Sequence, residues 1–186
     1  MKRLWAIVLS LAVALPLLGE DDPWARLVAG DRLPELSVEL TDGTTITSAD
    51  LEGKVVWIAL WASWCPSCRK EFKRLAGSDE FRALTQRDGF LFLPIAREES
   101  AATVVAWLKE KGYPFVAAPD SEREVYSLFA EQEIPRNIIV DGQGVIRHHS
   151  SRYSRSELKA MATLAAELLE EATPQEVCEM VVNQPQ

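Results

Sequence analysis

The sequence predicts a single α/β domain, with a central mixed β-sheet and helices on both of its faces. Two observations predict this class. In the first part of the chain, strand-like apolar runs alternate with helical patterns, as in parallel strands joined by helices. Residues 138–146 then form an antiparallel hairpin pattern, and a last helical pattern follows it. The 186 residues suit one domain, and the 47% apolar content is enough for a packed core.

Residues 1–19 have the pattern of a secretory signal. A positively charged start precedes the apolar stretch 4–18, which is shorter than the about 20 residues of a membrane-spanning helix. Cleavage after Gly19 would place Leu17 where a small residue is preferred, so an uncleaved anchor through residues 4–18 stays an alternative. We therefore expect an exported protein, periplasmic or otherwise extracytoplasmic, in which residues 20–32 form a polar lead-in segment.

Acidic residues outnumber basic residues in this chain. The sequence has 28 Asp and Glu against 20 Lys and Arg, and its net charge is −8. A chain with this charge repels polyanions. The composition therefore predicts no nucleic-acid partner and argues against anionic membrane surfaces.

The first predicted elements are a hairpin and a short helical turn. Residues 36–40 alternate between apolar and polar side chains, as a half-buried strand does. Asp42-Gly43 is a strong turn signal, and it separates this strand from a second one over 44–47. Residues 48–51 are predicted to form one helical turn.

A buried strand and a long helix follow the hairpin. Residues 55–61 are apolar on both faces, which is typical of a central strand covered on both sides. Helical spacing of apolar residues extends over 69–87, where Gly77 is expected to bend or divide the helix. A second apolar strand covers 90–95, and Pro94 is expected near its end because proline cannot donate to a β-ladder.

The rest of the domain, predicted over 33–170, alternates further. A helix is expected over 101–111 and a strand over 115–118. The capping box of Ser121 and Glu124 is expected to open a helix that reaches Phe129. A hairpin of 138–140 with 145–146 follows, and the last helix begins at the capping box of Ser154 and Glu157. Residues 171–186 are predicted as a polar tail.

The chemistry is concentrated in a Cys-x-x-Cys motif, Cys65 and Cys68, between the central strand and the next helix. Free N–H groups and the dipole at a helix start stabilise a thiolate on the first cysteine, and the spacing lets the second close a disulfide. A loop this small stabilises a fold little, so the pair is interpreted as redox-active. A zinc site would need ligands from His148, His149 and Cys178, whose spacing is not ligand-like, so no metal is expected.

These motifs resemble those of the TlpA/ResA-like extracytoplasmic thiol-disulfide oxidoreductases, which belong to the thioredoxin-fold superfamily. The resemblance covers about residues 33–169. It implies a thioredoxin fold with an N-terminal β-hairpin extension. It also implies that Cys65 is the nucleophile and that Cys68 resolves the mixed disulfide. The segments that carry the resemblance are 61–71 (WASWCPSCRKE), 134–135 (IP) and 140–144 (VDGQG).

The resemblance assigns further roles around the cysteines. Glu71 would serve them as proton acceptor or pKa modulator, since Ala59 stands where thioredoxins place an aspartate. The residues alone leave open a solvated charge paired with Lys70 or Arg74. The substrate-binding residues would be Trp64, Pro66 and Ser67 beside the motif, and Ile134 with Pro135, whose peptide bond is expected to be cis. Arg136 follows where these proteins often carry threonine, whereas Trp61 is expected in the core.

We therefore predict an exported thiol-disulfide oxidoreductase that reduces or exchanges disulfides in envelope proteins, including a role in cytochrome c maturation. Its partners would be disulfide-containing envelope proteins and a membrane thiol electron donor, and no cofactor is expected.

Three alternatives remain: a thiol peroxidase of the peroxiredoxin-like branch, a copper-binding chaperone on the same fold, and a binding module that only captures partners. Peroxiredoxins have threonine where Ala62 stands, and the copper chaperones space their cysteines by three residues. Cys178 is either an incidental thiol or a link to another thiol.

Overall fold

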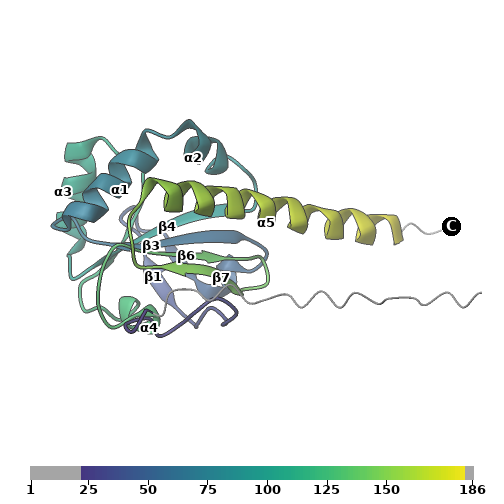
Figure 1. Cartoon of the computed structure of the whole chain (residues 1–186), viewed down its shortest axis with the longest axis horizontal. Helices are drawn as coiled ribbons and strands as arrows, with labels where there is room; N and C mark the ends of the chain where they lie inside the picture. The colour runs from purple at the N-terminus through teal and green to yellow at the C-terminus, as the bar shows by residue number, and fades with distance from the viewer. Residues whose placement is uncertain (1–21, 183–186) are drawn as a thin grey trace, which may run out of the picture.

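The computed structural model describes residues 22–182, with side chains described up to residue 171 (Figure 1). The predicted signal segment, 1–19, lies outside the described residues. The strands form a five-stranded sheet in the order β5-β4-β3-β6-β7 and a separate two-stranded sheet of β1 and β2. The elements are, in chain order, β1 (Ser37–Glu39), β2 (Thr45–Thr47), the 3-10 helix η1 (Ser48–Leu51), β3 (Val55–Trp61), α1 (Pro66–Ala76), α2 (Asp79–Leu84), β4 (Phe90–Arg97), α3 (Ala101–Lys111), β5 (Ala118–Asp120), α4 (Tyr126–Phe129), β6 (Arg136–Val140), β7 (Ile146–Ser150) and α5 (Arg155–Val182).

Strand β3 lies at the centre of the sheet, and all of its residues are buried. It pairs in parallel with β4 and antiparallel with β6. Beyond these neighbours, β4 pairs in parallel with β5, and β6 pairs antiparallel with β7. A strand that is apolar on both faces needs cover on both, which only the middle of a layered fold supplies. The predictions of a mixed sheet and of a central strand over 55–61 are confirmed.

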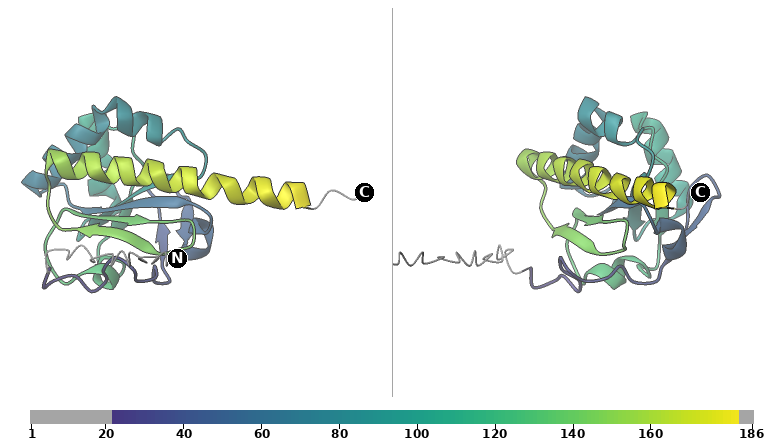
Figure 2. Two further views of the ribbon diagram at one scale, coloured as in Figure 1. Left: turned by 45° about the vertical axis from the view of Figure 1, so that its right-hand side comes forward. Right: turned by 90° about the vertical axis from the view of Figure 1, so that its right-hand side faces the viewer.

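The sheet separates two hydrophobic cores. Figures 1 and 2 show the elements that cover its two faces. Helices α1, α2 and α5 cover the face that carries Trp57 and Ala59. The β1–β2 hairpin, η1 and α4 cover the face that carries Ile58 and Leu60. A third cluster surrounds the end of β3, where α3 contributes Val104 and Leu108. Helices on both faces and an N-terminal hairpin extension are thus confirmed.

Glycines mark several element boundaries. Gly43 has a φ of +86° in the β1–β2 turn, and Gly112 has +64° at the end of α3, a left-handed conformation that other side chains disfavour. Gly77 ends α1, so the predicted helix over 69–87 consists of the two helices α1 and α2. Helix α1 begins earlier than predicted, at Pro66, because proline suits the first helical position.

One predicted helix start is wrong. The capping box of Ser121 and Glu124 was expected to open a helix, but α4 begins only at Tyr126. The Asp120 carboxylate accepts the Tyr126 N–H at 2.8 Å and so caps this short helix in place of Ser121. Arg123 has a φ of +62°, a conformation through which a right-handed helix cannot continue.

Two strand boundaries also differ from the prediction. The strand expected over 115–118 is β5, which covers Ala118–Asp120 because these residues pair with the end of β4. Pro94 lies inside β4 and not near its end. Since the β4–β5 pairing begins only at Ile95, Pro94 lies where β4 has a neighbour on one side only, and a residue without an N–H is tolerated there.

Helix α5 is longer than predicted. It continues to Val182, so most of the segment 171–186 is helical, and Figure 1 shows this part running past the sheet. Cys178 lies on this part of α5, and its side chain is outside the described residues. Within residues 22–182, no helix combines the length and the apolar character that crossing a membrane requires.

The aromatic cluster behind the Cys-x-x-Cys helix should carry a large share of the stability. Phe72 of α1 is fully buried, with its ring centroid 4.4 Å from that of Trp61 and 5.6 Å from that of Phe115. We expect Phe72→Ala to lower the free energy of unfolding by about 3–5 kcal/mol, because it leaves a cavity that the neighbouring rings cannot fill. Urea denaturation measures this, with Val105→Ala, an exposed position on α3, as the control. A loss no larger than that of the control would contradict the packing described.

Candidate active site

Cys65 and Cys68 lie where β3 passes into α1. Cys65 is the N-cap residue of α1, and its sulfur accepts the Cys68 N–H at 3.3 Å. The Ser67 hydroxyl oxygen lies 3.2 Å from the same sulfur. Both cysteines are free thiols, and Cys65 is 4% exposed whereas Cys68 is not exposed at all. The helix start therefore surrounds the first sulfur with donors and keeps the second inside the protein.

This arrangement gives the two thiols opposite acidities. A hydrogen bond from the Cys68 thiol is the largest cause that lowers the pKa of Cys65, to about 5; burial opposes it, and Ser67 and the Cys68 N–H support it. Burial raises the pKa of Cys68 far above its usual range, and the hydrogen bond to Cys65 raises it further. At neutral pH, Cys65 is thus a thiolate and Cys68 a protonated thiol. Such a pair combines a nucleophilic thiolate with a neighbouring thiol that becomes reactive only when it loses its proton.

Glu71 lies on the same helix, three residues after Cys68, and is fully buried. Burial is the main cause that raises its pKa, to about 8; hydrogen bonding by Asn137 opposes the rise, and the negative charge of Cys65 adds to it. Because the carboxyl group is buried, the interpretation of Glu71 as a solvated charge paired with Lys70 or Arg74 is wrong. A carboxyl group with this pKa can exchange protons near neutral pH.

Asn137 of β6 holds Glu71 in place. Its side-chain nitrogen donates to both carboxylate oxygens of Glu71, at 3.1 Å each, and its oxygen accepts the Trp57 indole N–H at 2.7 Å. An indole N–H can only donate, so it orients the amide with the NH2 group toward Glu71. Asn137 also pairs across the sheet with Ala59 of β3, the position where thioredoxins place an aspartate. In this protein the buried carboxyl group comes instead from Glu71 of α1. Sequence reasoning missed Asn137 and Trp57, although a lone asparagine within an apolar strand was a usable signal.

A loop over residues 132–135 lies against Cys65. The Ile134–Pro135 peptide bond is cis, as expected, and the Ile134 carbonyl oxygen lies 3.7 Å from the Cys65 sulfur. Glu133 adopts a left-handed conformation with a φ of +69°, and its carbonyl accepts the Tyr126 hydroxyl at 2.7 Å. The surrounding contacts thus hold the loop backbone next to the reactive sulfur.

The segment before Cys65 is held by a buried carboxylate. Glu99, which follows β4, is 5% exposed and accepts the Ser63 N–H at 2.7 Å, and it also bonds the Ser63 hydroxyl. Trp64, the next residue, is 54% exposed, and the Arg97 guanidinium lies 6.0 Å from the centroid of its ring. Pro66 is exposed as well, so apolar surface flanks Cys65 on both sides. Glu99 is a third residue of the site, after Asn137 and Trp57, that sequence reasoning missed.

The other sequence candidates lie as follows. Trp61 is fully buried, which confirms its place in the core. His148 lies on β7 with its ring nitrogen 2.6 Å from the Glu157 carboxylate, and His149 points inward to Arg136. Among the described residues, no group of three or more His, Cys, Asp or Glu side chains is arranged to hold a metal ion. The structure therefore brings the predicted residues of the Cys-x-x-Cys segment and of the loop with Ile134 and Pro135 together around Cys65. The two histidines lie elsewhere, on β7.

Comparisons with known proteins find thiol-disulfide oxidoreductases and thiol:disulfide interchange proteins that are similar to this chain. The curated proteins similar to the chain include "Thiol-disulfide oxidoreductase ResA" of Bacillus subtilis, 26% identical over 117 residues, with 63% of this chain and 64% of ResA covered. They also include "Thiol:disulfide interchange protein DsbE" of Escherichia coli K12, 27% identical, with 80% of this chain and 85% of DsbE covered. DsbE of Pseudomonas aeruginosa is 30% identical over 104 residues, and this match spans only 54% of that protein.

Solved structures show the same fold. A solution structure from Bacteroides thetaiotaomicron superposes with a TM-score of 0.75 at 27% identity, over 82% of this chain and 97% of that chain. The sequence profile of the AhpC/TSA family matches residues 29–149, a region that begins before β1, contains the dithiol and the cis-proline, and ends within β7. The chain has the thioredoxin fold and belongs to the AhpC/TSA family.

Proposed function

We propose that this protein is an exported thiol-disulfide oxidoreductase that reduces or exchanges disulfides in partner proteins. The observation that carries the proposal is the opposite acidity of two neighbouring thiols: the hydrogen bond from the Cys68 thiol lowers the pKa of Cys65, and burial raises the pKa of Cys68. The names of the ResA and DsbE relatives support it. A resolving thiol already in contact with the nucleophile favours disulfide exchange over the peroxidase alternative.

In the first step, the Cys65 thiolate attacks one sulfur of the partner's disulfide. The partner's S–S bond breaks, a mixed disulfide forms with Cys65, and the released sulfur takes up a proton. The partner's chain would lie along the backbone at Ile134 and Pro135, since the Ile134 carbonyl is next to the attacking sulfur. The exposed ring of Trp64 and the exposed Pro66 would contact it, and Ser67 would stabilise the thiolate before attack.

In the second step, Cys68 must lose its proton before it can attack Cys65. Formation of the mixed disulfide removes the negative charge of Cys65, which is one cause of the raised pKa of Glu71. The pKa of Glu71 then falls, and its carboxylate, held by Asn137, can accept the Cys68 proton. Attack by Cys68 closes the Cys65–Cys68 disulfide and releases the partner with both of its cysteines reduced.

The finer parts of the proposal concern partners and location. The partners would be disulfide-containing envelope proteins, with apocytochrome c among them, and a membrane thiol donor would reduce the Cys65–Cys68 disulfide again. Residues 1–19 would direct export as a signal peptide, or residues 4–18 would remain as an anchor. The relationship to ResA and DsbE supports an extracytoplasmic location.

The order of the two steps can be tested by trapping. With Cys68→Ser, the mixed disulfide cannot be resolved, so we expect a stable adduct with oxidised insulin that mass spectrometry assigns to Cys65. Cys65→Ser is the matched control, and it should form no such adduct. Equal trapping by the two variants would contradict the assigned roles.

The acidity of Cys65 predicts a pH profile. Because only the thiolate reacts, alkylation of the reduced protein by iodoacetamide should rise with pH around an apparent pKa of about 5 and then stay level. Cys68→Ala removes the largest cause of the lowered pKa, so its profile should move to higher pH. Peptide mass spectrometry follows Cys65 separately from Cys178. A wild-type profile centred near the ordinary cysteine pKa of about 8.5 would refute the assignment.

The burial of Glu71 predicts how stability changes with pH. The folded protein holds this proton more tightly than the unfolded chain does, because the pKa is raised from 4.5 to about 8. This contribution to stability is therefore present at low pH and is lost as pH rises through that window. Glu71→Gln does not titrate, so it should gain stability relative to wild type as pH rises, by about 1.4 kcal/mol for each unit of the shift.

Urea denaturation at several pH values measures this difference. Glu80→Gln makes the same chemical change at an exposed position of α2 and should follow the wild type across the range. A difference between Glu71→Gln and wild type that does not change with pH would show that Glu71 is not a buried, titrating group.

A further inference from the structure

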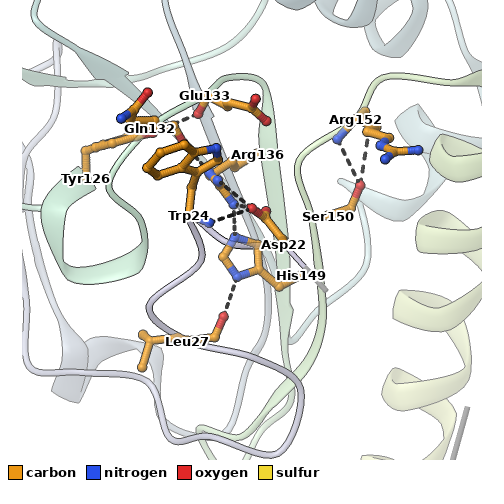
Figure 3. A network of polar contacts seen from close by, with 10 residues as sticks. All are labelled: Asp22, Trp24, Leu27, Tyr126, Gln132, Glu133, Arg136, His149, Ser150 and Arg152. Carbon is orange, nitrogen blue, oxygen red and sulfur yellow. Dashed lines mark hydrogen bonds and ion pairs between the residues drawn. The ribbon is translucent and has the colours of Figure 1, made fainter. Parts of the chain in front are cut away.

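Arg136 joins the cis-proline loop to the N-terminal end of the described chain (Figure 3). Its side chain is fully buried. Its Nη1 atom donates to Asp22 Oδ2 at 2.5 Å, and its Nη2 atom donates to Asp22 Oδ1 at 3.3 Å. Its Nε atom donates to the Gln132 carbonyl oxygen at 2.9 Å. One guanidinium group therefore connects the first and last residues of the segment 132–136 to Asp22.

Residues 22–26, which we call the strap, run alongside the chain that leads into this loop. The Arg26 N–H donates to the Phe129 carbonyl, and the Glu131 N–H donates to the Trp24 carbonyl, both at 2.9 Å. Ala25 and Ala130 form an antiparallel bridge between these two bonds. The strap thus adds a short strand-like pairing next to the loop, and Asp22 lies at its beginning.

His149 completes the surroundings of Arg136. Its Nδ1 atom lies 2.7 Å from the Leu27 carbonyl oxygen, an acceptor, so Nδ1 carries the proton. Its Nε2 atom is then an acceptor, and it lies 3.4 Å from Arg136 Nη1. Burial is the main cause that lowers the pKa of His149; the hydrogen bond to the Leu27 carbonyl opposes it, and the nearby Arg136 charge supports it, so the ring stays neutral. The guanidinium therefore has partners from the strap, the loop and β7.

The Asp22–Arg136 pair is charged; the Arg136 side chain is fully buried and the Asp22 side chain is 20% exposed. Burial alone would raise the pKa of Asp22, but hydrogen bonds from Arg136 and from the Trp24 N–H, with the Arg136 charge, lower it to about 2. A buried ion pair is weak evidence for stability, because apolar residues of similar size often stabilise a fold equally well. What an ion pair adds is a defined geometry, since a bidentate contact fixes both distance and direction.

We propose that the Asp22–Arg136 pair positions the cis-proline loop for the partner protein. Arg136 binds both the Gln132 carbonyl and Asp22 of the strap, so the backbone from 132 to 136 is fixed in one position. In that position the Ile134 carbonyl lies next to the Cys65 sulfur. The pair acts through Ile134 and Pro135 on a disulfide-bonded polypeptide, which must lie along this backbone. It does not act on small reagents, which reach Cys65 without the loop. The inference rests on the proposed function.

The test compares a polypeptide disulfide with a small reagent. For Asp22→Asn, kcat/KM for the reduction of insulin should fall by about tenfold, because a misplaced binding group loses productive geometry. The pH profile of Cys65 alkylation by iodoacetamide should stay that of the wild type. Asp22→Glu, which keeps the charge, should recover part of the loss. Asp79→Asn is the matched control, because it makes the same change at the exposed Asp79–Arg82 pair of α2.

A double variant separates positioning from stability. The double variant Asp22→Leu with Arg136→Met replaces the ion pair by apolar side chains. Its melting temperature should return to that of the wild type. If the pair positions the loop, kcat/KM for insulin stays low although the fold is stable. The proposal is overturned if the double variant regains the wild-type kcat/KM. It is also overturned if Asp22→Asn shifts the pH profile of Cys65 alkylation enough to account for the loss of insulin reduction. Failure of the proposed function itself looks different, since the wild type would then not reduce insulin at all.

Discussion

The register between β3 and its two neighbours determines where the chemistry of this protein can occur. Because β3 and β6 are antiparallel, with Leu60 opposite Arg136, the end of β3 and the beginning of β6 meet at one edge of the sheet. The dithiol follows the end of β3, and the cis-proline precedes the beginning of β6, so the two become neighbours. Strand β4 is parallel to β3 and ends at the same edge, where Glu99 binds Ser63.

Around this edge, the protein buries ionisable groups that would otherwise be solvated. Glu71, Glu99 and Arg136 are nearly or fully removed from water, and each is satisfied by a group from a distant segment. Burial of a polar group is costly unless its hydrogen bonds are replaced, so each of these contacts restricts the geometry of the chain that supplies it. The acidities of the two thiols separate at the same place, because the hydrogen bond from Cys68 lowers the pKa of Cys65 while burial raises the pKa of Cys68.

Sequence patterns predicted the regular elements well where local signals and tertiary demands agree. The apolar run of β3, the glycine that ends α3 and the Asp42-Gly43 turn are such cases, because a short stretch of chain determines each of them. Prediction failed where a distant group decided the boundary. Helix α4 begins late because Asp120 caps it, and β5 lies where β4 offers a free side, and neither partner is visible in the local pattern.

The sequence by itself identified the candidate reactive pair and predicted its order, because a Cys-x-x-Cys motif between a buried strand and a helix start places the first sulfur among free N–H groups. It also indicated the cis-proline through resemblance. Only the tertiary structure decided the environment of Glu71 and the partners of Arg136, since Asn137 lies 66 residues from Glu71 and Asp22 lies 114 residues from Arg136. The physical reason is that acidity and buried charge depend on the water excluded and the dipoles supplied by segments that folding alone brings together.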